Sequence, residues 1–140
     1  MKIMLVGNDG VATAMLNALK NYYTVEDVKA VDFNHPTHKT AVADVEEYLK
    51  NFDTNEKLVV ITDKFGSTAF TETVLALQKT GVIFNSLVLR GMSLPMILKV
   101  YSVKDNINGW QTIQKVYEKA NVFTYTLNRN YIFDVVRNAG

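Results

Sequence analysis

The chain has 140 residues, the size of one ordinary domain, and we expect residues 1–140 to form a single domain. Its 15 Lys and Arg nearly balance its 14 Asp and Glu, so charge gives no reason to expect a nucleic-acid partner or an anionic membrane surface. The absence of cysteine excludes disulfides and thiolate metal sites, and no apolar run approaches the ~20 residues of a membrane-spanning helix. We therefore expect a cytoplasmic protein without direct membrane insertion.

Short apolar runs rich in Val and Ile recur along the chain. They are Ile3–Val6, Val28–Phe33, Leu58–Thr62 and Val82–Leu89. Turn residues follow each run, and a segment of helical spacing follows most of them, which predicts alternating strands and helices. After the second run, for example, Val42, Val45 and Leu49 share one helical face and charged residues occupy the other.

The last third of the chain predicts one more helix and one more strand. Helical spacing covers Ile107–Ala120, and Lys104–Asn108 before it is interpreted as a solvated connection. Asn121–Leu127 alternates like a strand, either antiparallel at the sheet edge or lent to a partner. Apolar strands joined by helical crossovers are best buried on both faces. The sequence thus predicts an α/β fold with a doubly wound, mostly parallel sheet and helices on both faces.

Three turns of this sheet are candidates for a binding site, because ligands of doubly wound folds bind beyond the carboxyl ends of the strands. The turns are 7–10, 63–68 and 90–95, and each places glycine and small polar residues before a helix, where free N–H groups favour an anion such as phosphate. The residues that we expect to bind an anion or a partner are Gly10, Gly66, Ser67, Thr68, Gly91 and Ser93. The structural alternative is that the Ser and Thr residues are helix N-caps and that Pro95 begins a helix.

Two of these turns lie in motifs that resemble a known family. Residues 59–77, VVITDKFGSTAFTETVLAL, resemble the L-hydrophobic-D-x-x-GGSPxN segment of the mannose-family enzyme IIA proteins of the bacterial sugar phosphotransferase system (PTS). Residues 91–98, GMSLPMIL, resemble the G-x-N-LPM loop of the same family. IMLVGNDGVATAML (3–16) resembles that family's first strand, S/T-H-G turn and first helix. The resemblance implies a homodimer with strand order 2-1-3-4 and a last strand that can be exchanged between subunits. It also implies phosphoryl transfer from the histidine-containing phosphocarrier protein, through a histidine, to an enzyme IIB partner.

The resemblance places the phosphoacceptor position on Asn8 and the aspartate that orients the acceptor imidazole on Asp63. The family's small backbone donors fall on Gly66, Ser67 and Thr68. A carboxamide nitrogen has its lone pair delocalised into the carbonyl group, so it cannot form a useful phospho-intermediate. We therefore expect an enzyme IIA-like protein that is deficient in phosphoryl transfer and acts as a binding or regulatory module, with no cofactor and no metal ion.

Three other residues are candidate substitutes for the missing acceptor. His35 and His38 follow the second strand, which lies beside the first turn in the family's strand order. Asp9 with Asp63 faintly resembles the aspartyl-phosphate sites of receiver domains, although those sites use an acidic pair to hold Mg²⁺. An active phosphotransferase subunit in sugar uptake is thus one alternative, and a protein that binds a small anionic metabolite is another. In the structural alternative, Asp9 caps the first helix and Asp63 hydrogen-bonds the Asn8 amide.

Overall fold

The computed structural model describes residues 1–34, 38–64, 66–119 and 124–126 and contains one sheet with the strand order β2-β1-β3-β4-β5. The strands are β1 (Lys2–Asn8), β2 (Val28–Phe33), β3 (Leu58–Thr62), β4 (Ser86–Arg90) and β5 (Thr124–Thr126). The first four are parallel, and β5 pairs antiparallel with β4. The predicted mostly parallel sheet and its 2-1-3-4 order are confirmed. The rest of the stretch 121–127 lies outside the described residues, and exchange of this strand with a partner stays a prediction.

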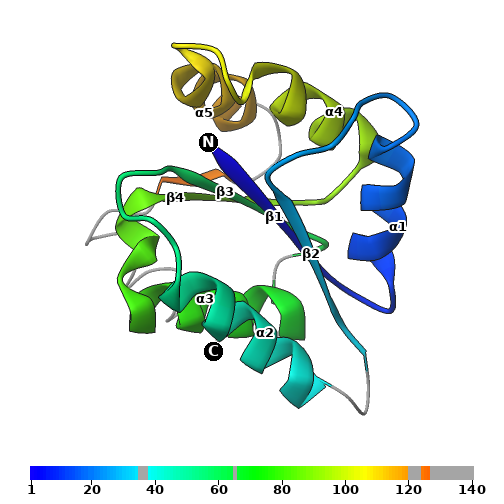
Figure 1. The fold of residues 1–140 in the computed structure, drawn as a ribbon, viewed down its shortest axis with the longest axis vertical. Helices are drawn as coiled ribbons and strands as arrows, with labels where there is room; N and C mark the ends of the chain where they lie inside the picture. Colours follow the sequence, from blue (N-terminus) through cyan, green and yellow to red (C-terminus); the bar gives the residue numbers. More distant parts are fainter. Residues whose placement is uncertain (35–37, 65, 120–123, 127–140) are drawn as a thin grey trace.

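Helices cover both faces of the sheet, as Figure 1 shows. They are α1 (Val11–Leu19), α2 (His38–Lys50), α3 (Thr68–Thr80), α4 (Leu94–Val103) and α5 (Gly109–Lys119). The helices α2 and α3 pack on one face, and α1, α4 and α5 pack on the other. This arrangement confirms the doubly wound α/β prediction, and it leaves the strand ends free to form sites.

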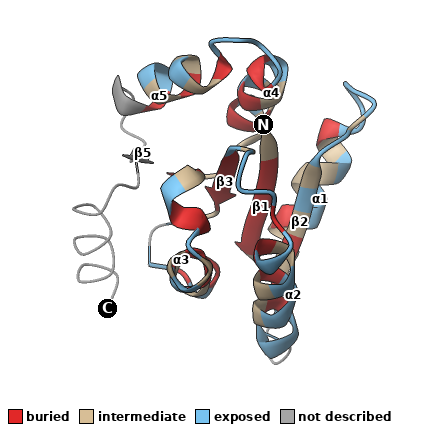
Figure 2. Ribbon diagram, turned by 60° about the vertical axis from the view of Figure 1, so that its left-hand side comes forward, coloured by how far each residue is buried: buried red, intermediate tan, exposed pale blue. Residues whose placement is uncertain are grey.

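The core consists of two apolar layers separated by the sheet. Along β1, Met4 and Val6 pack toward α2 and α3, whereas Ile3 and Leu5 pack toward the opposite helices. All five residues of β3 are buried, and Figure 2 shows the central strands as the most buried part of the molecule. Burial on both faces explains why these strands are continuous apolar runs and do not alternate.

The predicted strand Val82–Leu89 is wrong over its first half. The left-handed Gly81 (φ 78°) ends α3, and the chain then makes a 3₁₀ turn, η1 (Val82–Asn85), before β4 begins at Ser86. Val82 and Ile83 are nevertheless buried, because the turn packs under α3. An apolar run alone does not distinguish a buried turn from a buried strand.

The helix predicted from Ile107 begins at Gly109, where two backbones approach closely. A Cβ atom at position 109 would lie 2.0 Å from the carbonyl oxygen of Val103 at the end of α4. The corner between α4 and α5 is therefore closed by main-chain contact, and residue 109 has no space for a side chain. Ile107, just before this corner, is 96% exposed.

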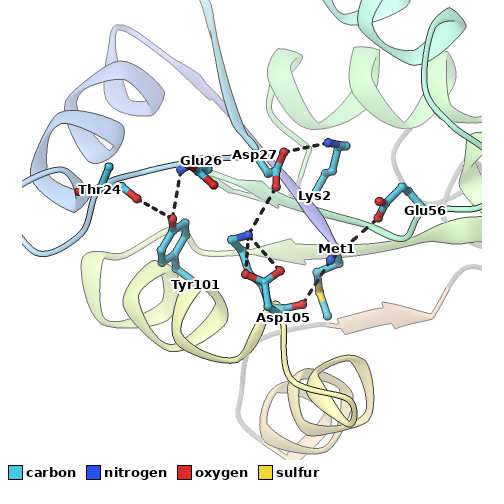
Figure 3. A network of polar contacts seen from close by, with 9 residues as sticks. Met1, Lys2, Thr24, Glu26, Asp27, Glu56, Tyr101 and Asp105 are labelled. Atoms are coloured by element: carbon cyan, nitrogen blue, oxygen red, sulfur yellow. Dashed lines mark hydrogen bonds and ion pairs between the residues drawn. The ribbon is translucent and has the colours of Figure 1, made fainter.

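The prediction that Lys104–Asn108 is simply a solvated connection is wrong for Lys104, whose side chain is only 5% exposed. Its ammonium lies 3.6 Å from Asp27 and 3.0 Å from Asp105, and 5.3 Å from the centre of the Tyr101 ring (Figure 3). Lys2 holds the other oxygen of Asp27 at 2.8 Å. The Tyr101 hydroxyl bonds two backbone groups of the loop before β2. This polar network ties α4 to the amino-terminal ends of β1 and β2.

Candidate functional site

The three turns identified from the sequence lie together where β1, β3 and β4 end. The backbone N–H of Asn8 donates a hydrogen bond of 3.0 Å to the Asp63 carboxylate, which joins the first turn to the second. The backbone N–H of Met92 donates to the carbonyl oxygen of Thr62 at 2.9 Å, which joins the third turn to the end of β3. The turns thus form one continuous surface at the carboxyl edge of the sheet.

Asp63 is the central acceptor of this surface. One carboxylate oxygen accepts the Asn8 N–H, and the other accepts the Lys64 N–H at 2.8 Å and the Ser67 hydroxyl at 2.7 Å. These donors fix the orientation of the carboxylate. The expected bond to the Asn8 amide is made by the main chain, and the Asn8 carboxamide has no hydrogen-bond partner within the part of the chain that the structure describes.

The prediction that Asp9 caps α1 is wrong. Asp9 is exposed, in the left-handed conformation (φ 58°), and the N-cap position is Gly10 (φ 82°), which supplies no side chain. The cap comes from Asp32 near the end of β2, which accepts the N–H groups of Ala12 (2.9 Å) and Thr13 (3.2 Å) and the Thr13 hydroxyl. Asp32 was missed because this cap depends on tertiary pairing, and the β1–β2 register sets it opposite Gly7.

A pocket of about 360 Å³ opens beside the first turn. Its lining includes Asn8, Asp9, Phe33, His38 and Thr68. His38, the first residue of α2, is exposed and shares this pocket with Asn8. His35, the other candidate histidine, lies outside the described residues.

The small polar residues of the second and third turns serve as helix caps. The Ser67 hydroxyl accepts the Phe70 N–H at 3.1 Å, and the Ser93 hydroxyl accepts the Met96 N–H at 3.3 Å. Pro95 lies in the first turn of α4, as expected. The structural alternative is thus confirmed for both serines, whereas Thr68 is the first helical residue of α3 and lines the pocket.

Two glycines of these turns, Gly66 (φ 77°) and Gly91 (φ 80°), are exposed and left-handed. A Cβ atom would meet no neighbour at either position, so conformation, and not space, favours glycine there. Over the ranges described, no three His, Asp or Glu side chains gather as they would around a metal ion. The helices in those ranges are also too short or too polar to cross a bilayer.

Comparison with known proteins gives a family and a fold. A family model described as the PTS system fructose IIA component (EIIA-man) matches residues 2–117. Among curated proteins, none is similar enough to this chain to be matched.

Two crystal structures have a similar fold. One is of a candidate phosphoenolpyruvate-dependent sugar phosphotransferase system permease from Klebsiella pneumoniae, with a TM-score of 0.63 and 17% identity over 81% of each chain. The other is of the phosphotransferase system component EIIA from Streptococcus agalactiae, with a TM-score of 0.56 and 16% identity over 99% of this chain and 90% of that one. At these identities the structural likeness establishes the fold.

Proposed function

We propose, since the chain belongs to the EIIA-man family of phosphotransferase system components, that it is a binding or regulatory form that carries no phosphoryl group on residue 8. The observation that supports this proposal is the carboxamide of Asn8 at the position where the resemblance places the acceptor histidine. An amide nitrogen is neither a nucleophile nor a leaving group at neutral pH, unlike the imidazole nitrogen of histidine.

The surroundings of Asn8 suit recognition of another protein. Its carboxamide lines the pocket without a hydrogen-bond partner among the residues described, so its donor and acceptor atoms are available to a partner. The exposed Asp9 beside it adds a carboxylate acceptor. We propose that enzyme IIB or the histidine-containing phosphocarrier protein docks on this edge in the cytoplasm, and that the chain forms a homodimer.

The decisive experiment measures phosphate uptake. The protein is incubated with labelled phosphoenolpyruvate, enzyme I and the phosphocarrier protein, and we expect no acid-labile phosphate on the wild-type chain. The Asn8→His variant should gain it, because Asp63 is already fixed beside the main chain of residue 8. Asn8→Gln is the matched control, because it keeps an amide at this position. Acid-labile phosphate on the wild-type chain would overturn the proposal.

A second candidate function is phosphoryl transfer through His38, which the shared pocket favours. In that reaction, an unprotonated nitrogen of His38 attacks the phosphorus atom of the donor phosphohistidine. One P–N bond breaks as another forms, and the donor imidazole leaves. His38→Gln should then abolish the label, while His35→Gln and Asp9→Asn should keep it. If only Asp9→Asn lost the label, and if hydroxylamine released the phosphate from the wild-type chain, the acceptor would instead be the Asp9 carboxylate, as an acyl phosphate.

Docking and dimerisation are tested separately from phosphate uptake. Titration calorimetry with enzyme IIB and with the phosphocarrier protein should detect binding that Asn8→Ala weakens. Sedimentation equilibrium should give twice the mass of the chain. A monomer would contradict the homodimer, and failure to bind either protein would contradict the docking role.

A further inference from the structure

A second groove lies at the amino edge of the sheet, away from the candidate site. The amino-terminal ends of β1 and β2, the carboxyl-terminal half of α2 and residues 51–53 after it line an open groove of about 550 Å³ there, a volume ordinary for a small-molecule site. A neighbouring depression of about 280 Å³ shares Lys2, Lys29 and Tyr48 with it. We call the two together the amino-edge groove. The seven residues of β1, about 20 Å of strand, separate it from Asn8.

The groove has an aromatic wall. The rings of Tyr48, on α2, and Phe52, just after this helix ends, have centroids 6.0 Å apart and are tilted by 50°. Phe52 is buried, and Tyr48 is half-buried with its hydroxyl lacking a hydrogen-bond partner within the described ranges. Burial raises the pKa of the Tyr48 phenol, so the hydroxyl stays protonated and can donate. This wall offers an apolar surface, mostly from the Tyr48 ring, and one free donor.

Charges of both signs face the groove without neutralising each other. Lys29 is exposed on β2 and makes no ion pair in the part of the chain that the structure describes, whereas Lys2 is held by Asp27 at 2.8 Å. Asp44 and Glu47, three positions apart on α2, are exposed and are likewise without an ion pair across the described residues. Asp53, just after α2, adds a third exposed carboxylate to the lining, also without an ion pair among the described residues. The groove therefore presents one available cation and three carboxylates.

We propose that the amino-edge groove binds a small zwitterion of the size of an aromatic α-amino acid. The ligand carboxylate pairs with Lys29, its ammonium group pairs with Asp44 or Glu47, and its ring packs against Tyr48 and Phe52. A simple anion such as phosphate is disfavoured by the three carboxylates of the lining. A simple cation leaves Lys29 without a partner, so a ligand that carries both charges uses the groove best.

The test uses L-phenylalanine as the probe, with binding to the full chain followed by NMR chemical shifts up to millimolar concentrations. N-acetyl-L-phenylalanine lacks the ammonium group, the methyl ester of L-phenylalanine lacks the carboxylate, and L-alanine lacks the ring. We expect saturable binding of L-phenylalanine and weaker binding of each analogue, by up to about fivefold, the scale of one exposed ion pair or one aromatic contact.

Variants then assign the contacts. The Lys29→Gln variant should bind L-phenylalanine about fivefold more weakly, and it should bind L-phenylalanine and the methyl ester with equal affinity. The double variant Glu47→Gln with Asp44→Asn should bind L-phenylalanine and the N-acetyl form with equal affinity. Lys50→Gln, an exposed change on α2 outside the groove, is the matched control and should leave binding unchanged. All these positions are exposed, so folding is retained and thermal melting can verify it. Absence of saturable binding by the wild-type chain, or binding that Lys29→Gln leaves unchanged, would overturn the proposal.

Discussion

Replacing Ser67 by alanine tests whether the turn after β3 is held together as the structure describes. The Ser67 hydroxyl accepts the Phe70 N–H at 3.1 Å as the N-cap of α3 and donates to the Asp63 carboxylate at 2.7 Å, and the side chain is buried. Alanine makes neither bond. The variant thus leaves a helix end without its cap and a carboxylate without one of its donors.

The expected cost follows from these two bonds. Loss of a serine N-cap costs about 1 kcal/mol. Loss of a hydrogen bond to a charged group costs about 1.5 kcal/mol at the low end, which applies because Asp63 keeps the N–H donors of Asn8 and Lys64. Ser67→Ala should therefore lower the free energy of unfolding by about 2–3 kcal/mol, and the melting temperature by about 6–10 °C.

Ser93→Ala is the matched control, because Ser93 caps α4 through a 3.3 Å bond to the Met96 N–H and has no hydrogen bond to a carboxylate within the described ranges. It should cost about 1 kcal/mol. Urea unfolding followed by circular dichroism gives both values, at one fixed protein concentration because dimerisation would make stability depend on concentration. Equal losses for the two variants would refute the assigned role of the Ser67–Asp63 bond. A double-mutant cycle with Asp63→Asn should show a positive coupling of about 1 kcal/mol.

Three further predictions concern single carboxylates and the buried lysine. Asp32→Ala should cost about 1–2 kcal/mol in urea unfolding, because it removes the cap of α1, and a neutral result would contradict that capping role. The hydrogen bond from Lys2 lowers the pKa of Asp27 below its ordinary value of 3.8. The ionised Asp27 carboxylate therefore stabilises the fold above pH 3.8, and this stabilisation is lost as the pH falls through the lowered pKa. The stabilities of Asp27→Asn and wild type, compared by urea unfolding, should thus converge on acidification, and a constant difference would exclude the charge as its cause. Lys104→Met should change the free energy of unfolding by less than about 1 kcal/mol, because the carboxylates of Asp27 and Asp105 are 42% and 76% exposed and stay solvated without the lysine. A loss above about 3 kcal/mol in urea unfolding, the scale of a buried charge left without its partner, would contradict this expectation.

Much of the fold was predictable because the strands follow a rule that acts locally. β1 and β3 are buried on both faces, so they are short runs of apolar residues, and the spacing of Val45 and Leu49 on α2 identifies the helical face that covers them. The prediction of a strand over 82–89 was wrong in its first half because apolar residues indicate burial but do not specify whether the buried backbone is a strand or a 3₁₀ turn.

The site was predictable in its location and less so in its details. The position of turns after parallel strands placed Asn8, Asp63 and Ser93 at one edge of the sheet, since the carboxyl ends of such strands coincide. The capping of α1 by Asp32 and the burial of Lys104 both depend on contacts between residues far apart in the sequence, which no local pattern encodes. The roles of the candidate site residues stay predictions that the phosphorylation assay tests.

The main-chain contact at Gly109 restricts how this protein can vary. Since a Cβ atom there would meet the Val103 carbonyl at 2.0 Å, even alanine must push α5 away from α4, and with it Tyr117, whose hydroxyl bonds the Met96 carbonyl. The displacement would reach the backbone at the start of α4, directly after the third turn of the candidate site. In a saturation mutagenesis library, position 109 should therefore be intolerant of every replacement, although it lies outside the three turns of the candidate site.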